Sequence, residues 1–188
     1  MSEDDLFRGA LVRLAAPRPE DAAIIASWSE RSAYPRLIDT DLAVPRTPGE
    51  IGRATVRAGD SLEFRLRTLE GDTLVGFVAL FGIEWNNRCA TIAIGIGDPA
   101  HRRRGYARDG MQLLLRYAFT EANLERVGLD VISYNEPAIA LYRSLGFQQE
   151  GVRRRAVMRG GRAYDRIDFG LLREEWASAT ESVALRIP

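Results

Sequence analysis

The pattern of apolar residues in the middle of the chain constrains the fold most strongly. Segments 62–69 and 74–83 alternate or are mostly apolar, and the turn Glu70-Gly71-Asp72 separates them, which predicts a β-hairpin. A third apolar segment, 89–96, follows another short turn, so we expect it to be an antiparallel neighbour. The middle of the chain is therefore predicted to form an antiparallel sheet.

A long amphipathic segment then interrupts the strands. From about Arg104 to Asn123 the apolar residues recur at helical spacing, and the short apolar segment 127–132 predicts the next strand. A strand, a helix and a strand in this order predict a right-handed parallel crossover. We therefore expect an α/β fold with a mixed, mostly antiparallel twisted sheet and flanking helices.

Capping and turn signals predict the remaining elements. Pro19 and the acidic residues after it begin a helix that runs to about Arg31, and the capping box Thr47-Pro48-Gly49-Glu50 begins a second one that runs to about Ala58. The other expected elements are a strand at 10–14, a loop with room for one helical turn at 32–46, a helix at 136–145 closed by Gly146, and strands at 147–158 and 164–172.

The length of 188 residues suits one compact domain with its own core. We expect a loose N-terminus at 1–9, a single domain at 10–176 and a surface tail at 177–188. The sequence has neither an apolar run of membrane-spanning length nor a basic leader followed by an apolar stretch, which predicts a cytoplasmic protein with no membrane partner. A homodimer is compatible with the sequence.

Charge and cysteine content narrow the ligand classes. The 26 basic residues, all arginines, balance 26 acidic ones, so no overall field favours nucleic acid, and we expect no nucleic-acid partner. Anions must then be bound locally, by guanidinium or backbone N–H groups. The single cysteine, Cys89, has no disulfide or metal partner, so we interpret it as buried filler and expect no metal.

One basic run has the features of an anion site. It lies between the strand at 89–96 and the long helix, where free N–H groups and the helix dipole favour a pyrophosphate. Gly105 would let the anion approach the backbone, and Ala107 would keep the first turn thin. The residues that we expect to contact the phosphates are Arg102, Arg103, Arg104, Gly105, Tyr106, Ala107 and Arg108.

Two alternatives exist for this region. A basic cluster is often merely solvated, but positive charge at a helix N-terminus opposes the dipole by about a few tenths of a kcal/mol per residue, which favours a bound anion. The run Gly95-Ile96-Gly97-Asp98-Pro99-Ala100 also fits a dinucleotide-binding pattern. That pattern requires the helix to begin inside the motif, whereas Pro99 places the helix start later.

Two blocks resemble a known family. The run Arg102-Arg103-Arg104-Gly105-Tyr106-Ala107 resembles the coenzyme-binding signature of the GNAT family of N-acetyltransferases, and Asn135 to Phe147 is similar to the family's second block. The segments Gly76-Phe77-Val78 and 84–88, with the closing segment 161–176, look like the subgroup that includes the ribosomal-protein N-terminal acetyltransferases. The resemblance covers about Leu11 to Trp176 and implies acetyl-CoA as co-substrate.

The resemblance also implies a site. The strands that hold Ile94 and Val131 would splay apart, and the pantetheine arm would bond to backbone groups of Gly95, Ile96 and Gly97. The family usually has bulky residues where the two glycines stand, which predicts a looser strand here. Asn135 is expected to cap its helix and to contact the coenzyme together with Ala138.

Tyr142 is the expected proton donor to the departing thiolate, since the resemblance places a tyrosine there, although an isolated tyrosine in a short helix is usually a packing residue. Glu84 is the best side-chain candidate for the base, but a surface role for Glu84 or proton removal through water remain alternatives. His101 lies at the phosphate end and is not expected to be the base. Trp28, Tyr34 and Trp85 are candidate walls of the acceptor pocket or packing residues.

The expected function is acetyl transfer to a primary amine by direct attack in a ternary complex. The expected acceptor is a small amine or a peptide or protein N-terminal α-amine. The alternatives are a non-catalytic acyl-CoA-binding sensor or partner-recruiting module, which would not need the Tyr142 hydroxyl, and an interaction domain without a ligand, which the dipole-opposing arginines argue against.

Overall fold

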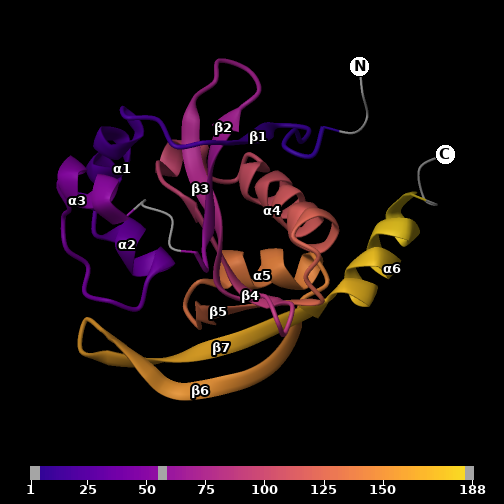
Figure 1. Ribbon diagram of the computed structural model, residues 1–188. Coiled ribbons are helices and arrows are strands. Elements are labelled where there is room, and N and C mark those ends of the chain that lie inside the picture. The colour runs from indigo at the N-terminus through magenta and orange to yellow at the C-terminus, as the bar shows by residue number, and fades with distance from the viewer. Residues whose placement is uncertain (1–4, 55–58, 185–188) are drawn as a thin grey trace. The chain divides into compact units, whose positions relative to one another are not determined.

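The computed structural model describes residues 5–54 and 59–184 (Figure 1). Within these ranges seven strands form one mixed sheet in the order β1-β2-β3-β4-β5-β7-β6. The β4 and β5 strands pair in parallel, whereas β1–β2, β2–β3, β5–β7 and β6–β7 are antiparallel. The predicted α/β fold with a mixed, mostly antiparallel sheet is confirmed.

The chain divides into two compact units. The first unit comprises Met1–Gly82 and Ile92–Tyr117, and the second comprises Ile83–Thr91 and Ala118–Pro188. The prediction of a single domain at 10–176 is not tested by this division and stays a prediction.

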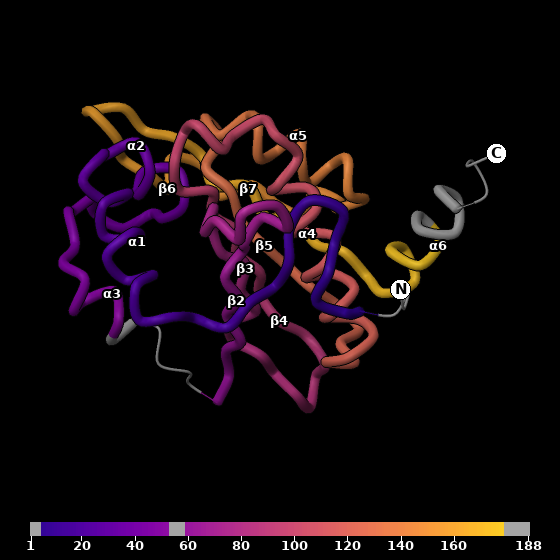
Figure 2. The backbone as a smooth tube through the Cα atoms, turned by 90° about the horizontal axis from the view of Figure 1, so that it is seen from above, coloured from indigo at the N-terminus to yellow at the C-terminus, as the bar shows by residue number. Residues whose placement is uncertain are grey.

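The first unit holds the antiparallel pairs β1–β2 and β2–β3 and four α-helices. Its helices α1, α2 and α3 lie beside one another in both Figure 1 and Figure 2, and α4 packs against β1. Its elements are β1 (Val12–Ala15), α1 (Asp21–Ser29), α2 (Ala33–Ile38), α3 (Pro48–Ala54), β2 (Leu62–Thr68), most of β3 (Leu74–Glu84), the second part of β4 (Cys89–Ile96), the 3-10 turn η1 (Pro99–His101) and α4 (Tyr106–Arg116).

The second unit is built around a long hairpin. The strands β6 and β7 pair with each other, β7 pairs with β5, and the start of β4 pairs with the start of β5 at Cys89, Ala90 and Thr91. Its further elements are β5 (Arg126–Ile132), α5 (Glu136–Ser144), β6 (Gln148–Arg159), β7 (Arg162–Leu172) and α6 (Arg173–Ala184), and a π-helical segment, η2 (Tyr117–Glu121), leads into it.

The two chain ends are more ordered than expected. Phe7, in the segment expected to be loose, packs its ring 6.4 Å from Phe64, and its carbonyl accepts a hydrogen bond from the Leu14 N–H at 2.8 Å. At the other end α6 continues from β7 through much of the expected surface tail, with Trp176 packed 5.3 Å from Phe119. Residues 1–4 and 185–188 lie outside the described residues.

Local signals near α3 were correctly interpreted. The Thr47 N–H donates to the Glu50 carboxylate at 2.8 Å, and the Glu50 N–H lies 3.4 Å from Thr47 Oγ1, so the capping box is confirmed. Residues 55–58, where this helix was expected to end, lie outside the described residues.

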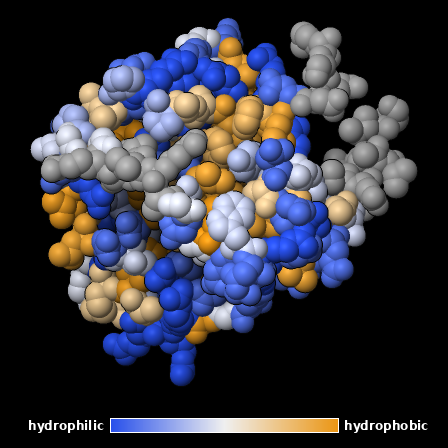
Figure 3. All heavy atoms as spheres, in the orientation of Figure 1, coloured by the Kyte–Doolittle hydropathy of each residue, from blue (hydrophilic) through white to orange (hydrophobic). Residues whose placement is uncertain are grey.

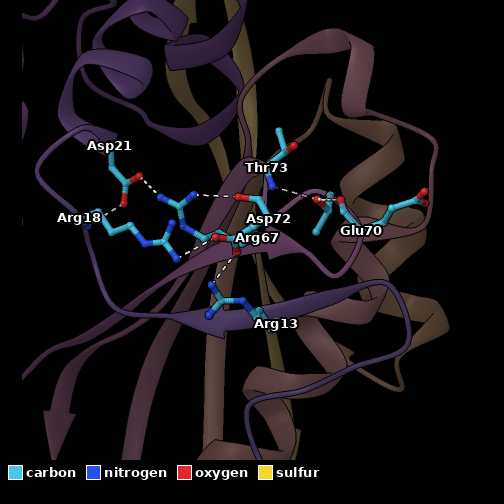
Figure 4. Close-up of polar contacts among 8 residues, drawn as sticks. Arg13, Arg18, Asp21, Arg67, Glu70, Asp72 and Thr73 are labelled. Carbon is cyan, nitrogen blue, oxygen red and sulfur yellow. Dashed lines mark hydrogen bonds and ion pairs between the residues drawn. The ribbon is translucent and has the colours of Figure 1, made fainter.

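A buried ion-pair network joins α1 to β2 in the first unit. Asp21, only 1% exposed, is salt-bridged to Arg67 (Figure 4). Asp21 also lies 3.8 Å from Arg65 Nε, and both arginines are buried. Glu63 contacts Arg65 from the same face of β2. The charged side of the alternating segment 62–69 therefore faces this network under α1 rather than solvent.

Asp72 forms a second, exposed set of ion pairs (Figure 4). Its carboxylate pairs with Arg13 at 2.6 Å and Arg18 at 2.8 Å, and these hydrogen bonds lower the pKa of Asp72 below its ordinary value.

We expect Asp21→Asn to destabilise the protein strongly. The change leaves two buried guanidinium groups without their shared countercharge, and breaking a buried pair from one side costs about 3–5 kcal/mol. Urea unfolding followed by circular dichroism measures this free energy of unfolding. Asp72→Asn is the matched control, since exposed ion pairs contribute little, and an equally small loss in both variants would contradict the buried network.

The surface is mixed in polarity. On the face drawn in Figure 3, hydrophilic and hydrophobic residues are interspersed. No helix in the described ranges is long and apolar enough to cross a membrane.

Candidate functional site

The basic run forms a tight loop before α4. The Asp98 carboxylate accepts the Ala100 N–H at 2.8 Å and caps η1, after which Arg103 and Gly105 both adopt positive φ, 59° and 84°. The helix begins at Tyr106, two residues later than expected. Gly105 is required at its own position because its left-handed backbone disfavours any residue with a Cβ.

An acidic residue that the sequence reading overlooked anchors this loop. The Asp109 carboxylate, in the first turn of α4, accepts hydrogen bonds from the backbone N–H groups of Ala10, Leu11 and Val12 at 3.1, 2.7 and 2.8 Å. Gly9 makes room for it, since a Cβ there would lie 2.5 Å from Asp109 Oδ2. The start of α4 is thereby fixed to the start of β1. The sequence signal that could have indicated this role is an acidic residue in the first turn of the predicted long helix.

The side chains of the loop suit an anion. Arg103 and Arg104 are exposed, and neither forms an ion pair within the described residues. The buried Nδ1 of His101 likewise lacks a hydrogen-bond partner in the described part of the chain. Arg102 lies near Tyr34, whose pKa is raised by burial although the Arg102 charge opposes the rise. The free arginines and the first N–H groups of α4 can together bind phosphates.

The end of β4, where coenzyme contacts were expected, is hydrogen-bonded to β3. The Gly97 N–H already donates to the Val75 carbonyl of β3 at 3.0 Å, and a Cβ on Gly76 would lie 2.0 Å from the Gly95 carbonyl oxygen. Because alternate residues of a strand point their backbone groups to the same side, Gly95 and Gly97 both face β3. By the same alternation, the N–H and C=O groups of Ile94 and Ile96 are expected to face away from β3. Contacts of Gly95, Ile96 and Gly97 with the coenzyme stay predictions.

Gly95 and Gly97 do not leave β4 loosely packed. A Cβ on Gly97 would lie 2.0–2.2 Å from atoms of the Trp28 ring, and one on Gly95 would lie 2.5 Å from Phe77 Cε1. Aromatic rings from α1 and β3 thus occupy the space where bulky side chains of β4 would stand. The expectation of a looser strand was wrong because this compensation cannot be read from β4 alone.

The helix α5 of the second unit holds Tyr142 in an apolar setting. The side chain is 7% exposed and packs 5.9 Å from Phe147 and 6.3 Å from Phe169, ring to ring. Burial raises the pKa of Tyr142 to about 12, with a smaller contribution from the Asp130 carboxylate. Its hydroxyl has no hydrogen-bond partner within the described residues and keeps its proton at neutral pH, so the proton is available to a ligand.

Comparison with known sequences decides the family. The sequence model of the Acetyltransferase (GNAT) family matches residues 28–147, which include both the loop before α4 and Tyr142. The chain belongs to the acetyltransferase (GNAT) family. The resemblance of the two sequence blocks is therefore confirmed, and the chain is an N-acetyltransferase whose acetyl donor is acetyl-CoA.

Individual relatives agree with this assignment. The SPbeta prophage-derived uncharacterized N-acetyltransferase YokL of Bacillus subtilis (strain 168) is 31% identical over 171 residues, which are 90% of this chain and 94% of that protein. The putative ribosomal N-acetyltransferase YdaF of the same strain is 30% identical over 104 residues, 55% of this chain and 56% of its own length.

A solved structure shares the fold. The spermidine N-acetyltransferase from Vibrio cholerae, crystallised in complex with CoA and spermine, matches with a TM-score of 0.79 at 24% identity. The match covers 88% of this chain and 98% of that one.

Other expected site residues of the acetyltransferase have clear local roles. Asn135 occupies the N-cap position of α5, and its carbonyl accepts hydrogen bonds from the N–H groups of Ala138 and Ile139, both at 3.1 Å. The predicted N-cap position is therefore confirmed, although the Asn135 side chain makes no capping hydrogen bond. Contacts of Asn135 and Ala138 with the coenzyme stay predictions.

Glu84 is exposed at the end of β3 and is engaged within its own turn. Its carboxylate accepts a hydrogen bond from the Asn87 Nδ2 amide at 2.5 Å. Desolvation, with a smaller contribution from the Glu84 charge, raises the pKa of the neighbouring Cys89 thiol. The role of Glu84 as a base stays a prediction. Cys89 is partly exposed rather than buried, and its raised pKa makes it a poor nucleophile.

The three aromatic candidates for the acceptor pocket differ in exposure. Trp28 and Tyr34, 7% and 5% exposed, pack against each other at 5.7 Å in a small core with Ile25 and Leu74. Trp85 is 53% exposed in the turn after β3. Trp28 and Tyr34 therefore support the end of β4 through packing, and any role toward the acceptor stays a prediction. Within the described residues, no group of His, Cys, Asp and Glu side chains could hold a metal ion.

Proposed function

We propose that this acetyltransferase moves the acetyl group onto a primary amine by direct attack in a ternary complex, and that the acceptor is a peptide or protein N-terminal α-amine or a small amine. The observation that carries the proposal is the buried Tyr142 hydroxyl, which has no hydrogen-bond partner within the described residues, since amine acetylation requires a proton for the departing thiolate.

Residues of the loop before α4 would hold the coenzyme. Arg103 and Arg104 would contact the pyrophosphate together with the first N–H groups of α4, while the outward backbone groups of Ile94 and Ile96 would bond to the pantetheine arm. The acetyl-CoA thioester supplies the activated acyl group. Tyr142 would donate its proton to the sulfur as the amine attacks, and the amine proton would leave through Glu84 or water.

Charge supports an acceptor that is not a polycation. The segment 28–46 carries Glu30, Asp39 and Asp41 against Arg31, Arg36 and Arg46, which cancel. Steering of a polyamine requires a negative field that this segment does not provide. An α-amine also has a lower pKa than a polyamine nitrogen, so a larger fraction is neutral and reactive at pH 7.

We expect kcat/KM to be higher on short peptides with free N-termini than on spermidine, as measured by thiol release from acetyl-CoA. The same peptides with blocked N-termini are the matched control and should give no turnover. A strong preference for spermidine would contradict the acceptor assignment.

The alternative function is a non-catalytic acyl-CoA sensor. It predicts tight coenzyme binding without thiol release above the uncatalysed rate for every amine in a panel, whereas the proposed function predicts release with at least one α-amine acceptor. The Tyr142 hydroxyl favours the catalytic function over the sensor, because a sensor does not require a proton donor on α5.

A further inference from the structure

The β6–β7 hairpin carries an irregularity that the acetyl-transfer chemistry does not use. Arg153 pairs with Arg166 and Val157 pairs with Tyr164, so three residues, 154–156, oppose the single residue Asp165. Arg155, inside this bulge, has a φ of 55°, a left-handed conformation that an arginine rarely adopts. Bulges of this kind redirect side chains and are frequent beside functional sites.

Hydrogen bonds of Asp165 connect the bulge to the loop before α5. Its carboxylate accepts the Arg155 N–H at 2.8 Å, its own N–H donates to Ser133 Oγ at 3.2 Å, and its carbonyl accepts the Ser133 N–H at 2.9 Å. The rings of Tyr134 and Tyr164 pack edge to face at 4.9 Å. The strained Arg155 backbone is therefore held beside the loop that leads into Asn135 and α5.

The side chains that the bulge presents are two arginines without ion-pair partners. Arg154 and Arg155 are both exposed, and neither guanidinium forms an ion pair within the described residues. Three other arginines of the second unit are neutralised by carboxylates: Arg126 by Glu150, Arg153 by Asp168, and Arg166 by Asp130. Two consecutive arginines without ion pairs, on a backbone that is held in place, can bind a carboxylate or phosphate.

We propose that Arg154 and Arg155 bind an anionic group of the acceptor, so that the enzyme favours peptides with an acidic residue close to the acetylated N-terminus. This inference rests on the proposed function, because it takes the loop of Asn135 and the helix of Tyr142 as part of the transfer site. The same two charges would repel a polyamine, in agreement with the balanced charge of segment 28–46.

The test compares two peptides that differ only in charge, with Glu or Gln at the second and third positions after a free N-terminus. The wild type should show a kcat/KM about tenfold higher on the Glu peptide, the scale of one charge-assisted contact. The variant that combines Arg154→Gln with Arg155→Asn should lose this preference, and asparagine is chosen because it tolerates positive φ. Arg162→Gln, which changes an equally exposed arginine of the same hairpin, should retain the preference.

Binding of the N-terminally blocked Glu peptide, measured by calorimetry, provides a readout that does not depend on catalysis. Absence of turnover on every amine would overturn the proposed function, whereas the anion site is supported if the blocked peptide binds the wild type and not the double variant. Equal kcat/KM on the two peptides in the wild type, or an equal loss in the Arg162→Gln control, would overturn it. Tighter binding of an oligouridine through the same two arginines would also overturn the peptide assignment in favour of a nucleic acid.

Discussion

Tyr142→Phe should lower turnover by about 10²-fold or more while leaving the affinity for acetyl-CoA unchanged, the usual scale for loss of one general acid. The substitution removes only the hydroxyl, and the ring can keep its packing against Phe147 and Phe169. Stability should change little, because the hydroxyl has no hydrogen-bond partner within the described residues. Thiol-release kinetics and calorimetric titration with acetyl-CoA measure the two quantities separately.

The pH dependence gives the same assignment a second test. Because burial raises the pKa of Tyr142 to about 12, the active protonated form is present at neutral pH and is lost only as the pH rises toward that value. Tyr164→Phe is the control, since it removes the hydroxyl of a half-buried tyrosine of the second unit while keeping its ring contact with Tyr134. Full activity of Tyr142→Phe would show that water protonates the thiolate and that Tyr142 only packs.

The parts of the fold that the sequence predicted well are those with local signals. The capping box at Thr47, the hairpin turn after β2 and the period of α4 each depend on residues within a few positions of one another. The end of α4 was placed too far along the chain, because η2 continues the apolar spacing in π-helical geometry. The helix α6 was missed because its mostly polar sequence resembles a tail.

Long-range partners could not be predicted from local patterns. Asp21 was predicted only as one of the acidic residues that begin a helix after Pro19, whereas its carboxylate neutralises Arg65 and Arg67 of β2. Gly95 and Gly97 suggested a loose strand because the rings that replace their side chains come from Phe77 and Trp28. In each case the decisive neighbour lies at least 18 positions away in the sequence.

Gly105→Ala should weaken acetyl-CoA binding by about tenfold or more, the cost of disturbing one charge-assisted contact to the phosphates. At a φ of 84° a Cβ costs about 1–2 kcal/mol of backbone strain, so the loop is expected to shift and to misdirect the N–H groups at the start of α4. The new Cβ would also lie 2.9 Å from Leu11 Cδ1, the flexible end of a side chain that can move.

Gly146→Ala is the control that separates a loss of stability from a loss of acetyl-CoA binding. Gly146 has a φ of 94° after α5, and a Cβ there would meet Leu171 Cδ1 at an ordinary 3.6 Å, so its backbone strain is comparable. Both variants should therefore lose a similar free energy of unfolding in urea, while calorimetry should show weaker acetyl-CoA binding only for Gly105→Ala. Equal affinity in the two folded variants would mean that the phosphates do not bind at the start of α4, and the coenzyme assignment for Arg103 and Arg104 would fall with it.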